Sequence, residues 1–196
     1  MLERYGVFGL LRIIISYVYT KIFHPHARLI RLPIDFRNKK YLQIGKGLTT
    51  GFGCRIEVHP IDLNLKKCLI FGINIELNDY VHIAAGEKII IGDNVLIASK
   101  VFISDINHGN YSNINQDSPL TVPNKRTLST NPVIIEDNVW IGESVSILSG
   151  VTIGKGTIVG ANSVVSKSLP PNVIAVGSPA KPIKKYNFET LKWEKI

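Results

Sequence analysis

The stretch IEDNVWIGESVSILSGVTIGKGTIVGANSVV, from Ile135 to Val165, repeats with a period of six residues. Aliphatic residues occupy every sixth position: Ile135, Ile141, Ile147, Ile153, Val159 and Val165. An amphipathic helix needs apolar residues every three or four positions, and a half-buried strand needs them every two. A period of six fits neither of these. It fits a triangular coil in which each of three short sides uses six residues and points one aliphatic anchor inward.

The same spacing occurs upstream, in the groups Ile44–Thr50–Ile56, Phe71–Leu77–Ile83 and Ile91–Ile97–Ile103. Three six-residue units make one coil, so we predict about five coils between residues 42 and 170. Stacked coils bring equivalent strands about 4.8 Å apart, and the stacking supplies the core that a single coil cannot bury. The predicted class is all-β, a parallel β-helix. Residues 1–41 are expected to form a helical segment with a lead-in, and residues 171–196 a C-terminal extension with a helix.

The composition is that of a globular protein. The chain has 196 residues, of which 45% are hydrophobic and 19% charged, which argues against disorder. Its two cysteines, Cys54 and Cys68, lack the neighbours of a metal site or a redox pair, so we interpret them as core thiols in a reducing compartment. The net charge of +8 is spread along the chain without a basic, aromatic stripe. Anionic cofactor phosphates or lipid surfaces are therefore favoured over nucleic acid as partners.

Residues 1–24 contain an apolar helical face: Leu11, Ile14, Ile15, Val18 and Ile22. Arg12 interrupts the apolar run and Lys21 ends it, so we expect the segment to be too short and too charged to span a membrane. One alternative is a helix that buries this face against the first coil and caps it. The other is a peripheral membrane contact. The two roles are compatible.

The repeat breaks between Ile103 and Ile135, where a polar, proline-containing excursion loop occupies residues 104–134. A long loop on a regular scaffold usually carries function. The loop opens with SDINHG, and His108 is its candidate general base, because histidine titrates near neutral pH. The alternative is an ordinary solvated loop histidine.

Four segments together resemble a known family: NDYVHIAA (78–85), LIASKVFISDINHG (96–109), the repeat from Asn138 to Val165, and GSPAKPIKKY (177–186). They are similar to the hexapeptide-repeat acetyltransferase superfamily, and most of all to the bacterial lipopolysaccharide (O-antigen) O-acetyltransferases. The resemblance implies a left-handed β-helix and a homotrimer with active sites between subunits. It also implies transfer of an acetyl group from acetyl-CoA to a sugar hydroxyl in surface polysaccharide synthesis.

On this resemblance, His108 is the catalytic base of a direct transfer, without an acyl-enzyme. Asp105 either orients the His108 imidazole or bonds backbone in its own loop. Asn78 matches a position that faces the acceptor, or it is a corner asparagine with left-handed backbone. Relatives often carry histidine where this chain has Ile106, a departure that leaves His108 intact.

The resemblance also places coenzyme A in a groove along the late coils. The matching cofactor-binding residues are Trp140, Gly142, Gly160, Ala161, Ser166, Lys167, Lys181 and Lys184. Many relatives have serine where this chain has Glu143, so that position is not assigned a contact. For each lysine the alternative is an ordinary solvated surface charge.

Two alternative functions stay open, and a metal site is set aside. A small-sugar or xenobiotic O-acetyltransferase would share the motifs, and a non-catalytic β-helix scaffold would not bind coenzyme A. Zinc would need histidines at matched coil positions, and His59 lies far from His82 and His108 in coil register, so no metal is predicted. We expect a cytoplasmic protein with peripheral contact at the inner membrane face. The sequence does not reveal the acceptor sugar, its hydroxyl, or whether a nucleotide or lipid carries it.

Overall fold

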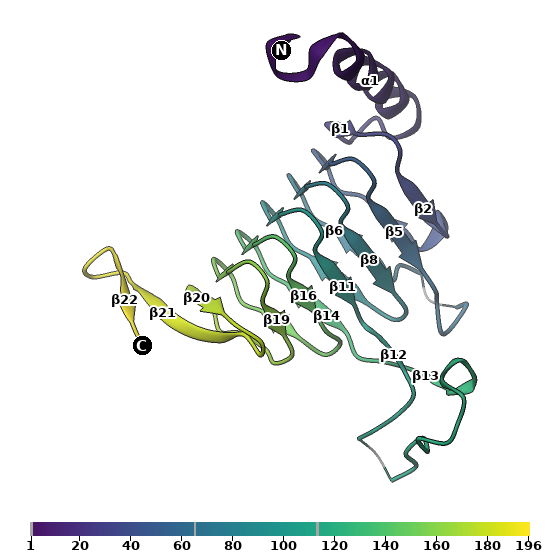
Figure 1. Ribbon diagram of the computed structural model, residues 1–196, viewed down its shortest axis with the longest axis vertical. Helices are drawn as coiled ribbons and strands as arrows, with labels where there is room; N and C mark the ends of the chain where they lie inside the picture. Colours follow the sequence, from purple (N-terminus) through teal and green to yellow (C-terminus); the bar gives the residue numbers. More distant parts are fainter. Residues whose placement is uncertain (1, 65, 113) are drawn as a thin grey trace.

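The computed structural model describes residues 2–64, 66–112 and 114–196, and its strands form three parallel sheets that enclose one core (Figure 1). Sheet A contains β1 (Leu29–Ile30), β4 (Thr49–Thr50), β7 (Glu76–Leu77), β10 (Leu96–Ile97), β15 (Trp140–Ile141), β18 (Ile158–Val159) and β20 (Val173–Val176). Sheet B contains β2 (Asp35–Arg37), β5 (Arg55–Val58), β8 (His82–Ala85), β11 (Phe102–Ser104), β16 (Ser146–Ile147) and β19 (Val164–Val165). Sheet C contains β3 (Leu42–Gln43), β6 (Leu69–Phe71), β9 (Ile89–Ile91), β14 (Val133–Ile135) and β17 (Thr152–Ile153). The chain visits A, B and C in turn, so the predicted parallel β-helix is confirmed.

The aliphatic anchors form the core. In sheet B, Ile83 pairs with Ile56 on one side and Ile103 on the other, and all three side chains are fully or almost fully buried. Neighbouring residues on each strand point outward, as the two-residue alternation of a strand requires. The period of six therefore predicted correctly which residues face the core. Strands β1 and β2 extend sheets A and B into the predicted lead-in.

The corners between the sheets are tight because each coil lies directly on the next. A Cβ atom at Gly51 would lie 2.3 Å from the carbonyl carbon of Asn78, and one at Gly142 would lie 2.6 Å from the backbone nitrogen of Ala161. No side chain fits at such distances. The small residues after the anchors are thus explained first by coil stacking.

Helix α1 (Leu2–Phe23, interrupted at Gly6) lies along β1 at the first coil (Figure 1). It is attached through polar side chains: the N–H of Ile30 donates to Thr20 Oγ1 (2.8 Å), and the N–H of Leu32 donates to Ser16 Oγ (3.1 Å). Both hydroxyl residues are buried. These bonds satisfy part of the backbone at the exposed edge of the stack.

The apolar face of α1 remains exposed: Leu11, Ile14, Ile15, Val18 and Ile22 are each about half accessible or more. The expectation that a cap would bury this face is wrong, because Ser16 and Thr20 make the contact from the opposite side. By length and a mean hydropathy of 1.5, Tyr5–Phe23 is also long and apolar enough to cross a membrane, contrary to our expectation.

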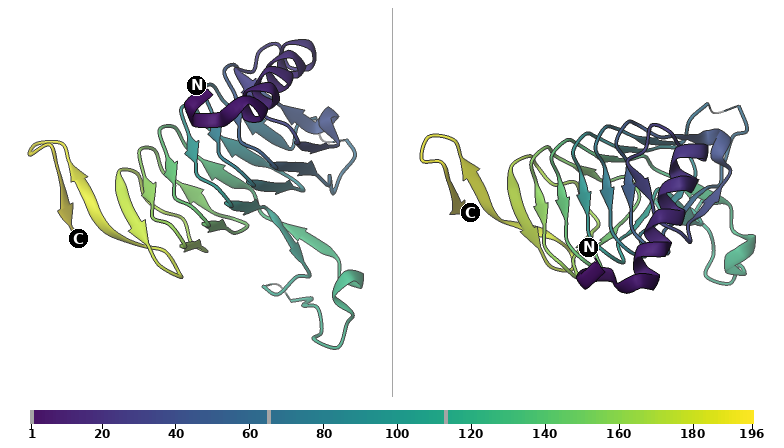
Figure 2. Two further views of the ribbon diagram at one scale, coloured as in Figure 1. Left: turned by 45° about the horizontal axis from the view of Figure 1, so that its top comes forward. Right: turned by 90° about the horizontal axis from the view of Figure 1, so that it is seen from above.

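The predicted C-terminal helix is wrong. Residues 181–196 form two antiparallel strands, β21 (Lys181–Asn187) and β22 (Lys192–Lys195), which continue sheet A beyond β20 and project from the stack (Figures 1 and 2). Exposure alternates along β21 with the period of a strand. Pro182 disfavours a helix, and β20 offers an unpaired edge on which the segment completes its hydrogen bonds.

The remaining short elements are η1 (Lys39–Tyr41), η2 (Pro123–Lys125) and the hairpin strands β12 (Ile106–His108) and β13 (Leu128–Thr130). The hairpin and η2 belong to the excursion loop, which leaves the stack between β11 and β14 (Figure 2). The loop therefore projects at the corner between sheets B and C.

Candidate functional site

Asp105 anchors the base of the excursion loop. Its carboxylate is fully buried and accepts hydrogen bonds from the backbone N–H groups of Gly86 (2.6 Å), Glu87 (2.9 Å) and Lys88 (2.6 Å) on the preceding coil. The N–H of Asn131 donates to the Asp105 carbonyl oxygen (3.0 Å), which brings the two ends of the loop together. Both carboxylate oxygens thus bond backbone, as in the second role considered for Asp105, although on the neighbouring coil instead of its own loop.

His108 lies on β12, opposite Leu128 of β13. Its carbonyl oxygen accepts a hydrogen bond from the Tyr111 hydroxyl, and Arg126 Nη1 donates to that hydroxyl at 2.7 Å. These contacts hold the backbone of His108 while its side chain stays exposed. An accessible imidazole on a fixed backbone suits a general base.

The two faces of the hairpin look toward different coils. Residues 106 and 108 share one face with their partners Thr130 and Leu128. On that face, a Cβ at Gly86 would meet both Ile106 and Thr130 at 2.8 Å, and Thr130 Oγ1 donates to Glu87 Oε2 (2.8 Å). The face that carries His108 is therefore turned toward the earlier coils.

The opposite face of the hairpin is polar and turned toward the later coils. Asn107 Nδ2 donates to Ser149 Oγ, 2.5 Å away on the following coil. A polar hollow opens here, lined by Asn107, Gly109, Asn110, Tyr111, Ser112, Thr127, Ser129, Thr130 and Asn131. The hairpin thus lies between the earlier and the later coils of the stack, and its face that carries His108 is turned toward the earlier ones.

Asn78 lies away from His108 within one chain. It follows β7 at the corner between sheets A and B, and its Nδ2 donates to the carbonyl oxygen of Ile97 (3.1 Å). The left-handed backbone expected there is found at Tyr80 (φ 59°) instead. The excursion loop leaves from the other edge of sheet B, so one chain does not bring Asn78 and His108 together.

The predicted cofactor residues lie in three regions of the late coils. Gly142, Gly160 and Ala161 occupy one corner between sheets A and B, and Trp140 is about half exposed on the outer face of sheet A. A Cβ at Gly160 would lie 2.7 Å from Val176 Cγ1 but 3.7 Å from the nearest backbone atom, so a side chain here would displace only the Val176 side chain.

The remaining four lie elsewhere. Ser166 and Lys167 are exposed directly after β19, at the corner between sheets B and C. Lys181 and Lys184 lie on β21, opposite Val176 and Ile174 of β20. The structure thus places all the predicted cofactor residues in the last coils without joining them into one groove of a single chain.

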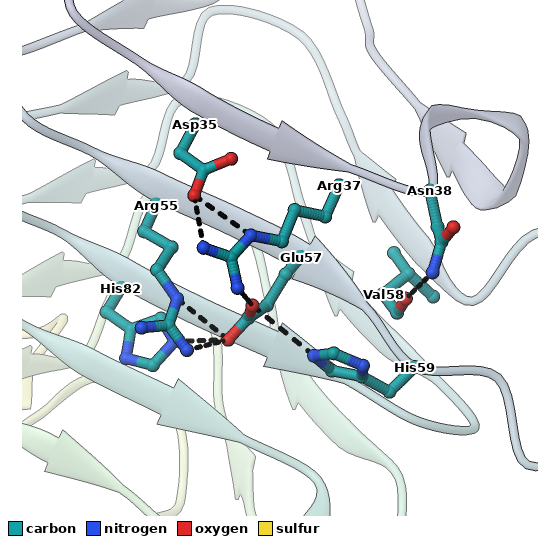
Figure 3. Close-up of polar contacts among 8 residues, drawn as sticks. All are labelled: Asp35, Arg37, Asn38, Arg55, Glu57, Val58, His59 and His82. Carbon is teal, nitrogen blue, oxygen red and sulfur yellow. Dashed lines mark hydrogen bonds and ion pairs between the residues drawn. The ribbon is translucent and has the colours of Figure 1, made fainter.

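A charged cluster on sheet B was not predicted. We call it the Glu57 cluster; its members are Asp35, Arg37, Arg55, Glu57, His59 and His82 (Figure 3). Glu57 is only 2% exposed although it points outward from β5, because the other side chains cover it. The sequence held one signal: Arg55, Glu57 and His59 alternate along a strand and so share its outer face.

Each oxygen of Glu57 has two cationic or imidazole partners. Oε1 accepts from Arg55 Nε and lies next to His82 Nε2, each at 2.9 Å. Oε2 lies 3.0 Å from Arg37 Nη1 and 3.3 Å from His59 Nε2. Burial alone would raise the pKa of Glu57, but hydrogen bonds from Arg55, His82 and His59 outweigh it and lower the pKa to about 2. Glu57 is therefore an anion at neutral pH, surrounded by nitrogen atoms of two arginines and two histidines.

Among the described residues, no group of three or more His, Cys, Asp or Glu side chains is arranged to hold a metal ion. His59 and His82 both bond Glu57. His59 and His82 thus meet at one carboxylate, whereas His108 lies apart from them on the hairpin.

Comparisons with known proteins agree with this architecture. Residues 132–167 match the family model for the bacterial transferase hexapeptide of six repeats. WbbJ of Escherichia coli, described as a candidate lipopolysaccharide biosynthesis O-acetyl transferase, is 43% identical over 194 residues, which cover 98% of this chain and 96% of WbbJ.

Two solved structures show the same fold. The N-acyltransferase AntD from Bacillus cereus, in complex with dTDP-4-amino-4,6-dideoxyglucose and coenzyme A, has a TM-score of 0.67 and 26% identity over 84% of each chain. A hexapeptide-repeat acetyltransferase from Vibrio cholerae has a TM-score of 0.56 and 26% identity over 90% of this chain and 82% of its own. With the end-to-end similarity to WbbJ, these findings show that the chain belongs to the hexapeptide-repeat acetyltransferase superfamily.

Proposed function

We propose that this chain transfers the acetyl group of acetyl-CoA to a sugar hydroxyl during surface polysaccharide synthesis, as in lipopolysaccharide O-antigen. The observation that carries the proposal is the accessible imidazole of His108 on a hairpin anchored between early and late coils. The end-to-end similarity to WbbJ supports the reaction and the substrate class. The AntD complex, which holds a sugar nucleotide together with coenzyme A, supports a site for both substrates at once.

In this mechanism, His108 accepts the proton of the acceptor hydroxyl as the oxygen attacks the thioester carbonyl of acetyl-CoA. The tetrahedral intermediate collapses to the sugar acetate, and the departing sulfur takes a proton from the imidazolium to give free coenzyme A. Such a base typically contributes about 10²–10⁴-fold to the rate. Burial raises the pKa of Cys54 to about 11 and also raises that of Cys68, so neither thiol is suited to form an acyl-enzyme.

The cofactor is proposed to lie along the late coils of a left-handed helix of about five coils. Ala161 and Ser166 would contact its pantetheine arm at the two corners that border sheet B, and Trp140 would flank the site. Lys167, Lys181 and Lys184 supply positive charge for its phosphates. Because these residues do not form one groove within a chain, a homotrimer with sites between subunits would complete it. Asn78 could then face an acceptor held by a neighbouring subunit.

We further propose that the exposed face of α1 contacts the cytoplasmic surface of the inner membrane. Its aliphatic residues stay accessible while Ser16 and Thr20 fix the helix to the first coil. A helix tied along one side to the stack suits a position in the membrane interface rather than across it. The net charge of +8 adds attraction to anionic lipids.

The decisive experiment is an acetyl-transfer assay of His108→Ala, with binding of acetyl-CoA measured by calorimetry. We expect turnover to fall by about two orders of magnitude or more, while cofactor affinity and the melting temperature stay at the wild-type level. His26→Ala, which removes another exposed histidine, is the matched control and should be fully active. Near wild-type turnover in His108→Ala would refute the assignment, and absence of acetyl-CoA binding by the wild type would favour a scaffold.

A further inference from the structure

The Glu57 cluster lies outside the catalytic hairpin but on the side to which His108 is turned. It brings together side chains from three adjacent strands of sheet B: β2, β5 and β8 (Figure 3). The strands of sheet B pair through their backbones, and their inward-facing aliphatic side chains pack in the core. Neither interaction needs the charged cluster. Replacing a whole buried ion cluster by apolar side chains is often neutral for stability, although removing a single partner from it is costly. Its arrangement therefore points to a role at its exposed surface.

Glu57 holds together groups that would otherwise repel one another. Arg37 and Arg55 are each about half exposed, and His59 and His82 are partly exposed. Each guanidinium has N–H groups beyond those that bind Glu57 and Asp35, and these groups can donate to an anion. Donors whose positions are fixed in advance bind an anion at low entropic cost.

The path from this cluster to His108 is short and lined by small residues. Glu57 pairs with Ala84, and Ala84 pairs with Ser104, so the three outward positions form one row across sheet B. Two strand spacings separate Glu57 from Ser104, about 10 Å. Ser104 is the last residue before the excursion loop, four positions before His108. Because Ala84 and Ser104 are themselves nearly buried, a hexose ring would lie over the side chains that flank this row, with a hydroxyl near the hairpin.

The hairpin itself reaches the cluster. Leu128, which pairs with His108, lines a hollow together with Asn38, Lys40, Tyr41, His59, Pro60, Ile61 and Leu63. His59 thus belongs both to the cluster and to the hollow below the catalytic hairpin. Lys40 adds a further positive charge there.

We propose that the Glu57 cluster binds the diphosphate of the acceptor, so that the enzyme acts on a diphosphate-linked sugar instead of a free one. This inference rests on the proposed acetyl-transfer function. Glu57 and Asp35 accept hydrogen bonds from only some of the N–H groups of Arg37 and Arg55. The diphosphate accepts hydrogen bonds from the N–H groups that remain exposed. A nucleotide or a polyprenyl lipid can carry the same diphosphate.

The test compares three acceptors that contain the same hexose: the free sugar, its nucleoside diphosphate conjugate, and its polyprenyl diphosphate conjugate in detergent. We expect the wild type to prefer the diphosphate-linked acceptors by roughly a hundredfold in kcat/KM, since several charge-assisted hydrogen bonds are added. Arg55→Gln and Arg37→Gln should each raise the KM for these acceptors roughly tenfold or more, with little change for acetyl-CoA. The preferred conjugate identifies the carrier.

Arg28→Gln is the matched control, because Arg28 is also exposed and ion-paired, to Glu76 at 3.2 Å, but lies outside the cluster. It should behave as the wild type. Calorimetric titration with the nucleoside diphosphate sugar and with inorganic diphosphate gives a readout that does not require turnover. Equal use of free and diphosphate-linked sugar, or wild-type diphosphate binding by Arg55→Gln, would overturn the inference. Loss of all acetyl transfer with intact diphosphate binding would instead count against the proposed reaction.

Discussion

Glu57 is a single residue whose charge state affects the stability of the whole chain. Its pKa is lowered from 4.5 to about 2 in the fold, so the folded state binds fewer protons than the unfolded state at acidic pH. The stabilisation is therefore complete above about pH 4.5 and is lost as the pH falls toward 2. The shift corresponds to on the order of 3 kcal/mol.

We predict that urea denaturation will show this dependence. The wild type should be more stable than Glu57→Gln at pH 7, and the difference should shrink steadily between pH 5 and pH 3. The groups that face Glu57 are Arg37, Arg55, His59 and His82, and the two arginines stay charged throughout this range. A difference that does not change with pH would show that the carboxylate charge is unimportant for stability.

Asp105 provides a second prediction for a single residue. Asp105→Ala leaves the N–H groups of Gly86, Glu87 and Lys88 without their acceptor, and an unsatisfied buried donor such as that of Gly86 costs about 1–3 kcal/mol. We expect a marked fall in melting temperature and faster proteolysis within residues 104–134. Asp105→Asn keeps one acceptor oxygen and should be intermediate. Asp62→Ala, at an exposed site, is the control. Unchanged stability in Asp105→Ala would contradict the anchoring role.

Helix α1 is the element whose prediction is most easily tested. The wild type should float with anionic vesicles, and binding should weaken as salt rises. Ile15→Ser together with Ile22→Ser should abolish flotation without loss of stability, since both side chains are more than half exposed. Leu191→Ser changes an equally exposed leucine at the far end of the molecule and should float as the wild type does. No flotation of the wild type would exclude the membrane contact.

The elements also show what the sequence could predict and what it could not. A repeat determines which side chains point inward, so Ile83 and Ile103 were assigned to the core correctly. Which outward residues meet depends on coil length, and the coils differ. Ile56 pairs with Ile83, 27 residues on, whereas Ile83 pairs with Ile103, 20 residues on, and Ile147 with Val165, 18 residues on. The Glu57 cluster spans the irregular coils, so a fixed period did not align its members.

The candidate site was predicted to a similar extent. His108 was identified because it interrupts a regular pattern, and the structure places it on a hairpin with an accessible side chain. The sequence does not predict the partner of Asp105, since the turn at residues 86–88 comes near it only after the coils stack. Gly142 is needed for stacking whether or not a cofactor passes it, because backbone atoms of the next coil lie too close for a side chain, whereas Gly160 meets only the Val176 side chain at such a distance.

For the whole molecule, we predict that each active site needs two subunits. Ala161→Glu places a charged side chain at an exposed corner of the proposed cofactor groove, so it should raise the KM for acetyl-CoA, while Ala161→Ser should not. In mixed trimers of His108→Ala and Ala161→Glu chains, about a quarter of the interfaces combine an intact histidine with an intact groove. Activity should return to that extent. If mixing restores nothing, the site lies within one chain.

The hydrogen bond between the Asn131 N–H and the Asp105 carbonyl oxygen joins the two ends of the excursion loop at one point of the stack. Because β11 and β14 pair only with strands of the neighbouring coils, we expect their register to survive replacement of the loop. This segment can therefore change in sequence and length during evolution without a change in the stack of coils. Grafting a foreign segment between Gly109 and Thr127, which keeps His108 and its partner Leu128, should therefore yield folded chimaeras that retain the general base and differ in acceptor preference.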